Sequence, residues 1–234
     1  MPQREPLSAP LLGALLVVGA LASGWLDLAV EALTQAGIGV LGGVPGLELV
    51  LTPPYGLPTV RIAPQGPVGP LILAAFHVAG PAAAMALGAA AHALAEALGL
   101  AGWVRVVAFE AFAFAWLRLP VVVVAAGVEG GAGPLASVYG GLGEPETGRW
   151  TAIALGLLLL WWISGLVAGR AVAMGREWLR VDGAAFRRRL VRLVAAYPFV
   201  VATVAFALGR AVAPPGWTAA LLAAAVGCLM LQSR

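Results

Sequence analysis

The chain has 234 residues, of which 61% are hydrophobic and only 11% are charged, and its formal net charge is +3. Soluble domains carry about a quarter charged residues. The composition therefore excludes an ordinary water-soluble domain and indicates an integral membrane protein. The single cysteine, Cys228, excludes an intrachain disulfide and a cysteine-rich metal site.

Six long apolar runs predict transmembrane helices, because about 20 apolar residues are needed to cross the hydrocarbon core of a bilayer. The first run is longer than the apolar core of a signal peptide, so we expect it to be retained as a helix. The runs predict an all-α helical bundle that forms a single integral membrane domain over residues 1–234. They lie at about 8–35, 68–99, 103–127, 150–174, 190–210 and 216–232.

The connection over residues 37–67 is longer than the other predicted loops. It contains two short runs of β-type residues, 48–52 and 59–63, on either side of a Pro/Gly turn. This pattern predicts a small external β-hairpin. An irregular cap on the lipid headgroups is the alternative, since five prolines between Pro53 and Pro67 restrict strand pairing.

All fourteen basic residues are arginine, and six of them fall in the short stretch 176–192 around the connection from the fourth to the fifth predicted span: Arg176, Arg180, Arg187, Arg188, Arg189 and Arg192. An arginine-rich short connection indicates the cytoplasmic side. We therefore expect a multi-pass protein of the bacterial inner membrane with both termini cytoplasmic and an external loop containing Glu129, Glu144 and Glu146. The clustering beside apolar segments favours the lipid bilayer over nucleic acid as partner. An interfacial helix on anionic headgroups and a coupling helix for an ATPase subunit are further interpretations.

Small residues at intervals of four predict close contacts between helices in lipid. They are Gly80, Ala84 and Gly88 in the second span and Gly165 and Gly169 in the fourth. Three prolines inside the predicted spans favour kinks: Pro81, Pro120 and Pro198.

Titratable residues fall in two layers of the predicted bundle. The first layer contains Asp27, His77 and Arg118. Each lies about nine residues from the external end of its span, so at 1.5 Å per residue all three share a depth of about 13 Å below the external surface. An ion pair between Asp27 and Arg118 is therefore permitted, with His77 beside it.

The second layer lies toward the cytoplasm. The short GLAGW turn makes the second and third spans antiparallel neighbours, so His92 is level with Glu110, and Glu96 lies one turn after His92 on the same helix face. Two interpretations stay open for both layers. The groups are either clasps that set the register of the helices or a proton or ion path along the bundle.

Signals for catalysis are weak. The sequence His92-Ala-Leu-Ala-Glu96 lacks the HExxH arrangement of zinc proteases, and His77 and His92 are about 22 Å apart along a straight helix, too far to share one metal. Ser164 lies before Gly165 in WWISGLVAG, but the later spans contain no histidine to activate it. A Walker motif is also absent. We therefore expect no enzyme, no metal and no cofactor.

The segment ALGLAGWVRVVAFEAFAFAWLRLPVVV resembles the prokaryotic Yip1-type membrane domain, and the WWISGLVAG helix is similar to that family's second hydrophobic region. The residues that carry the resemblance are Gly99, Gly102, Val107, Ala108, Phe109 and Pro120. The resemblance covers about a third of the chain. It implies a helical bundle without catalytic residues that associates with membrane organisation or trafficking partners.

The leading expectation is a non-catalytic integral membrane protein that acts through helix packing and partner subunits. The alternative is a transporter or ABC-type permease subunit, in which the layer of Asp27, His77 and Arg118 contacts substrate or protons.

Overall fold

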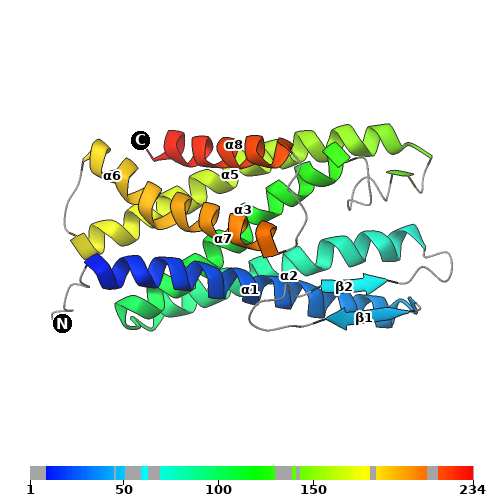
Figure 1. The fold of residues 1–234 in the computed structure, drawn as a ribbon, viewed down its shortest axis with the longest axis horizontal. Helices are drawn as coiled ribbons and strands as arrows, with labels where there is room; N and C mark the ends of the chain where they lie inside the picture. The colour runs from blue at the N-terminus through cyan, green and yellow to red at the C-terminus, as the bar shows by residue number, and fades with distance from the viewer. Residues whose placement is uncertain are drawn as a thin grey trace. The chain divides into compact units, whose positions relative to one another are not determined.

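The computed structural model describes residues 9–44, 46–50, 59–62, 69–129, 139–140, 143–179, 183–209 and 216–233. The four longest helices are α1 (Ala9–Leu41), α2 (Pro70–Ala97), α3 (Gly102–Glu129) and α5 (Pro145–Leu179). The shorter helices that follow are α6 (Ala184–Val191), the π-helix η1 (Arg192–Ala196), α7 (Tyr197–Gly209) and α8 (Gly216–Gln232) (Figure 1). The structure thus confirms the predicted helical fold class.

Four helical segments of the described chain are long and apolar enough to cross a membrane. They fall on the first four predicted spans: Leu15–Leu41, Val78–Ala97, Gly102–Val124 and Pro145–Met174. The two remaining predicted spans coincide with shorter helices, since α7 has 13 residues and α8 has 17. The described residues thus support four spans by length and composition, and the count of six stays a prediction.

The fifth predicted span begins at the end of α6 and passes through η1 into α7. In η1 the backbone N–H of Tyr197 donates to the carbonyl of Arg192, five residues earlier, as in a π-helical turn. Pro198 follows directly and has no N–H to return the chain to the α-helical pattern at that point. This change of register explains why an apolar stretch that looks uniform in sequence is divided into separate helical elements.

The described chain divides into two compact units. Unit 1 comprises residues 1–24, 88–117 and 160–234, and unit 2 comprises residues 25–87 and 118–159. Helices α1, α2, α3 and α5 each contribute one part to each unit.

Two helices end in glycine-based turns. At the end of α1, the N–H of Gly43 donates to the carbonyl of Val40, and the N–H of Val44 donates to that of Gly39. At the end of α2, Gly99 occupies the same position as Gly43. Both glycines have a positive φ, 67° at Gly43 and 57° at Gly99, a conformation that side chains with a Cβ rarely adopt. The second turn is the one that brings α3 back beside the end of α2.

Two short strands in unit 2, β1 (Leu47–Val50) and β2 (Thr59–Ile62), pair antiparallel with Leu47 opposite Ile62 (Figure 1). The turn residues 51–58 lie outside the described chain. Leu47 packs against the end of α1, because a Cβ atom added to Gly39 would lie 2.5 Å from Leu47 Cδ1. The strands are therefore anchored to α1 by an apolar contact.

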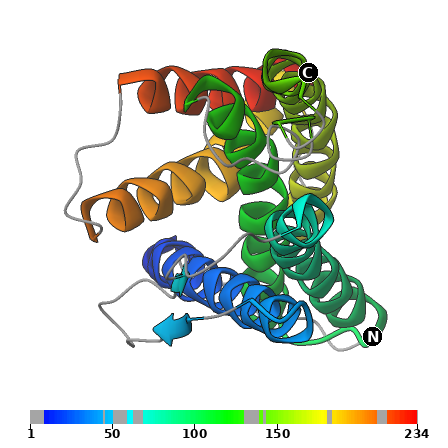
Figure 2. The same ribbon diagram turned by 90° about the vertical axis from the view of Figure 1, so that its right-hand side faces the viewer.

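The C-terminal helices pack within unit 1. Helix α8 contacts η1 and α6, and Figure 2 shows α8 in red and α7 in orange. The rings of Phe114 in α3 and Phe199 in α7 have centroids 6.0 Å apart, so α7 also packs on α3 through an aromatic pair.

Candidate intramembrane polar sites

The first polar site lies in unit 2 and joins α3 to α1. Nη1 of Arg118 forms an ion pair with Oε2 of Glu31, and both side chains are largely buried. Nε2 of Gln35, one turn further along α1, donates to Oε1 of Glu31 at 3.4 Å. The carboxylate of Glu31 is thus engaged on both oxygens, which is how a charge inside a membrane helix is stabilised.

Asp27 belongs to the same site but is not paired in the same way. It lies one turn before Glu31 in α1 and is only 2% exposed, within electrostatic range of both Arg118 and Glu31. Its Oδ2 atom has no hydrogen-bond partner in the described part of the chain. The site therefore brings two carboxyl groups to one guanidinium group.

Helix α2 packs closely against this site at Gly80. A Cβ atom on Gly80 would lie 2.6 Å from Cγ of Glu31 and 3.0 Å from its carbonyl oxygen, so any side chain at this position would collide with α1. His77 lies three residues earlier in α2, and its side chain is outside the described residues. The structure thus brings Asp27 and Arg118 of the predicted layer together. Glu31 is the member that the sequence reasoning missed, although its spacing of four from Asp27 places both on one helix face.

The second polar site lies in unit 1, at the turn between α2 and α3. Arg105 binds Glu96 through two parallel hydrogen bonds, Nε to Oε1 at 2.9 Å and Nη2 to Oε2 at 2.6 Å. The side chain of Arg105 is 3% exposed and that of Glu96 is 35% exposed. A bidentate pair of this kind fixes orientation as well as charge. Sequence reasoning missed Arg105, although it follows the GLAGW turn by two residues and Glu96 precedes that turn by three.

His92 lies among aromatic rings in the same unit. Its ring stacks on Phe112 with centroids 5.3 Å apart and an interplanar angle of 21°, and it meets Phe109 edge-on at 5.8 Å. Its Nδ1 atom has no hydrogen-bond partner among the described residues. The surroundings of this histidine are those of a packed aromatic core side chain.

Glu110 is buried in unit 1 against α1. It is 2% exposed, and Oε1 has no hydrogen-bond partner within the described ranges. A Cβ atom on Gly19 would lie 3.8 Å from its Cγ atom. Nearby, Ser23 of α1 donates to the carbonyl of Val107 at 3.4 Å. Residue counting predicted that Glu110 and His92 lie at the same depth. In the described structure, Oε1 of Glu110 and Nδ1 of His92 do not bond to each other.

The predicted packing residues differ in their surroundings. Gly88 lies directly on the backbone of α3, and Ala84 is fully buried. In α5, a Cβ atom on Gly165 would lie 3.4 Å from the side chain of Gln232, whereas Gly169 has no described atom within 4 Å of that position. The close backbone approach seen at Gly88 of α2 is therefore not found at Gly165 and Gly169 of α5.

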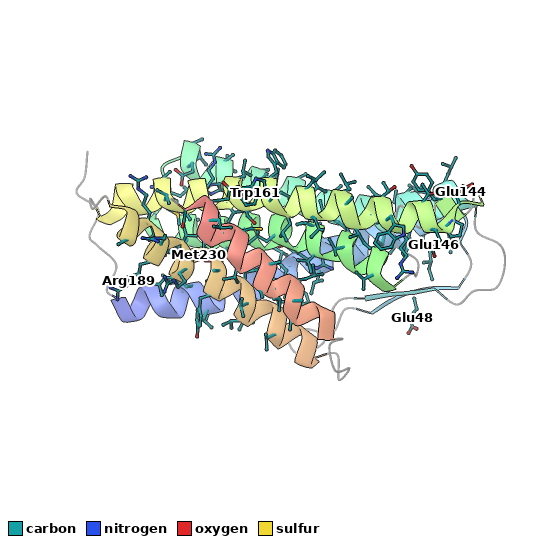
Figure 3. The ribbon with its side chains drawn as sticks, turned by 90° about the horizontal axis from the view of Figure 1, so that it is seen from above. Glu48, Glu144, Glu146, Trp161, Arg189 and Met230 are labelled. Atoms are coloured by element: carbon teal, nitrogen blue, oxygen red, sulfur yellow. The ribbon has the colours of Figure 1, made fainter. Side chains whose placement is uncertain are left out.

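The arginine-rich stretch is largely at the surface. Arg188, Arg189 and Arg192 are exposed and Arg187 is partly exposed; Figure 3 shows Arg189 on α6. The side chain of Arg176 and all of Arg180 lie outside the described residues. Figure 3 also shows Glu144 and Glu146 at the beginning of α5, where Glu146 and Arg149 form an ion pair at 3.8 Å.

Two sequence features bear on metal binding or hydrolysis, the His, Cys and acidic side chains and Ser164. Within the described ranges, no three His, Cys, Asp or Glu side chains lie close enough together to hold a metal ion. Ser164 is completely buried, and its Oγ atom has no hydrogen-bond partner among the described residues.

Comparisons with protein-family models, with curated proteins and with solved structures find no match to this chain.

Proposed function

We propose that this chain is a non-catalytic, multi-pass membrane protein that acts through helix packing and contacts with partner subunits. The observation that carries the proposal is the pair of ion bridges between helices, Glu31–Arg118 and Glu96–Arg105. A charge at the centre of a bilayer costs at least about 2.5 kcal/mol on insertion scales. Pairs between neighbouring helices recover part of this cost and also select one register. The resemblance to the Yip1-type domain belongs to the same proposal.

The membrane arrangement is part of the proposal. With either four or six spans, the arginine-rich stretch follows the fourth span, and both termini lie on its side of the membrane. The positive-inside rule supports the cytoplasmic side of a bacterial inner membrane for that stretch. In the six-span version, residues 190–210, which contain η1 and α7, and residues 216–232 of α8 are the fifth and sixth spans, and the paired strands β1 and β2 are external.

A second function, a transporter or permease subunit, is favoured by a different observation. Asp27 and Glu110 are both buried in candidate spans, and each has a carboxyl oxygen without a hydrogen-bond partner in the described chain. Buried polar atoms are nearly always paired in native proteins, so each exception calls for an explanation. A group that binds and releases a proton during transport is one such explanation.

Proton flux separates the two functions. The purified protein is reconstituted in liposomes with a trapped pH-sensitive dye, and a proton gradient is applied across the bilayer. The leading proposal expects the same leak as in empty liposomes, for the wild type and for Asp27→Asn. A flux in the wild type that Asp27→Asn removes, with normal reconstitution of the variant, would reject the leading proposal in favour of the transporter.

A further inference from the structure

Among its described residues, the polar site of unit 2 has two acidic side chains and one basic side chain. It contains the carboxyl groups of Asp27 and Glu31 in α1 and the guanidinium group of Arg118 in α3. If both carboxyl groups are ionised, the site has a net charge of −1 inside a candidate membrane span. An uncompensated charge in that position is strongly unfavourable.

The geometry identifies which carboxyl group is uncompensated. Glu31 is bonded to Arg118 through Oε2 and to Gln35 through Oε1. Asp27 is 2% exposed, and its Oδ2 atom has no partner among the described residues. The neutral pair of Glu31 and Arg118 is therefore complete without Asp27.

We propose that the carboxyl group of Asp27 is a proton-binding site, occupied by one exchangeable proton when Glu31 is paired with Arg118. The step is the addition of one H⁺ to the carboxylate of Asp27, which brings the net charge of the three groups to zero. The proposal deepens the transporter candidate by naming its ligand, and it depends on that candidate only for the step from proton binding to proton movement.

A proton fits this site better than a metal cation. Within the described ranges, no group of three acidic, histidine or cysteine side chains is close enough to hold a metal ion. The oxygens of Glu31 are already occupied, and the guanidinium group of Arg118 would repel a second cation. A proton needs only one oxygen and adds no net charge beyond neutrality.

Helix α2 also borders this site. Helix α2 packs on Glu31 through Gly80, which carries no charge. His77 lies three residues earlier in α2, with a side chain outside the described residues. A cationic His77 beside Asp27 would leave Asp27 ionised, so the experiment below also tests that arrangement.

The test uses infrared spectroscopy of the full chain in lipid nanodiscs at neutral pH. Protonated carboxyl groups have a carbonyl stretching band that ionised ones lack, and the band shifts to lower frequency in D₂O if the proton exchanges. We expect the wild type to show this band and Asp27→Asn to lose a component of it. Glu146→Gln is the matched control, because Glu146 is a 73% exposed carboxylate whose removal should leave the band unchanged.

A second variant makes the test sharper and does not require replacing Asp27. In Glu31→Gln, Arg118 faces one carboxylate only, so Asp27 should give up its proton and pair with Arg118. The Asp27 component of the band should then disappear although Asp27 is still present. In Arg118→Gln the site loses its positive charge and should take up a second proton, which strengthens the band.

The outcomes are decisive in both directions. A folded Asp27→Asn protein with the wild-type band, or a Glu31→Gln protein that keeps the band component, overturns the proton site. A band that depends on sodium concentration at constant pH assigns the site to a metal cation and also overturns it. If the band behaves as expected but liposomes show no flux, the proton site stands and only the transporter function fails.

Discussion

Gly88 of α2 lies directly on the backbone of α3: a Cβ atom at this position would be 3.0 Å from the carbonyl oxygen of Ala111. The same Cβ atom would be 3.1 Å from the Cα atom of Phe112. Because backbone atoms cannot move aside as a side chain can, we expect Gly88→Val to force the two helices apart. Overpacking of this kind destabilises by about 1 to 3 kcal/mol.

The measurement is thermal unfolding of the protein in detergent, with Gly169→Ala as the matched control. Gly169 lies in a helix and has no described atom within 4 Å of its Cβ position. We expect Gly169→Ala to be neutral or stabilising by about 0.5 kcal/mol, because alanine favours the helix. Equal loss of stability in both variants would contradict close packing at Gly88.

The pair of Glu96 and Arg105 should contribute measurably to stability. Arg105 is almost completely buried and makes two hydrogen bonds to Glu96. We expect Glu96→Gln to destabilise by about 1 to 3 kcal/mol, a range that allows for the partial exposure of Glu96. A double-mutant cycle with Arg105→Met, measured by chemical unfolding in detergent, would give the coupling energy of the pair.

The exposed pair of Glu146 and Arg149 is the control for that cycle. Nη1 of Arg149 and Oε1 of Glu146 are 3.8 Å apart, and the side chains are 39% exposed for Arg149 and 73% exposed for Glu146. Exposed pairs contribute about 0 to 1 kcal/mol, so a coupling energy as large as that of Glu96 and Arg105 would be unexpected.

Exchanging the charges of Glu31 and Arg118 should restore what either single exchange removes. Glu31→Arg places two cations together, and Arg118→Glu places three acidic groups in one site. The double variant again has opposite charges on α1 and α3. We expect both single variants to be recovered poorly as a monodisperse peak in size-exclusion chromatography, and the double variant to be recovered better than either one.

Absence of any rescue in the double variant would show that the ion pair does not hold α1 and α3 together. The matched comparison is the same exchange with Asp27 in place of Glu31. Since Arg118 is bonded to Glu31, and Oδ2 of Asp27 has no partner among the described residues, rescue should be weaker for Asp27→Arg combined with Arg118→Asp.

The proposed membrane arrangement predicts opposite labelling of two exposed positions. In a Cys228→Ser background, Ala185→Cys in α6 should react with an impermeant thiol reagent only after the inner membrane is opened. Glu48→Cys in β1 should react in spheroplasts whose inner membrane is intact. Both residues are exposed in the structure. Reaction of position 185 in intact spheroplasts would place the arginine-rich stretch outside and invert the proposed topology.

Much of the helical framework was predictable from the sequence. Four apolar runs can be recognised as candidate transmembrane helices from their length alone, because the thickness of the bilayer sets the minimum length of a span. Gly99 lies at the predicted end of the second span, whereas α1 runs to Leu41, beyond the end predicted at residue 35, and its terminal Gly43 was not predicted. The division of the fifth predicted span was not predictable, since the π-helical turn before Pro198 replaces only a few hydrogen bonds and leaves the apolar pattern unchanged.

The partners of the intramembrane charges were decided by tertiary structure. Counting residues from the loops placed Arg118 level with Asp27, but Glu31 lies only one helical turn away, and a long arginine side chain can reach either depth. The orientation of each helix about its own axis, which depends on contacts such as that of Gly80 with α1, selects Glu31. Sequence alone thus determined which residues are charged and about how deep they lie, because depth follows from helical rise. Only the packed structure determined which of them meet, because that depends on helix rotation and on side-chain reach.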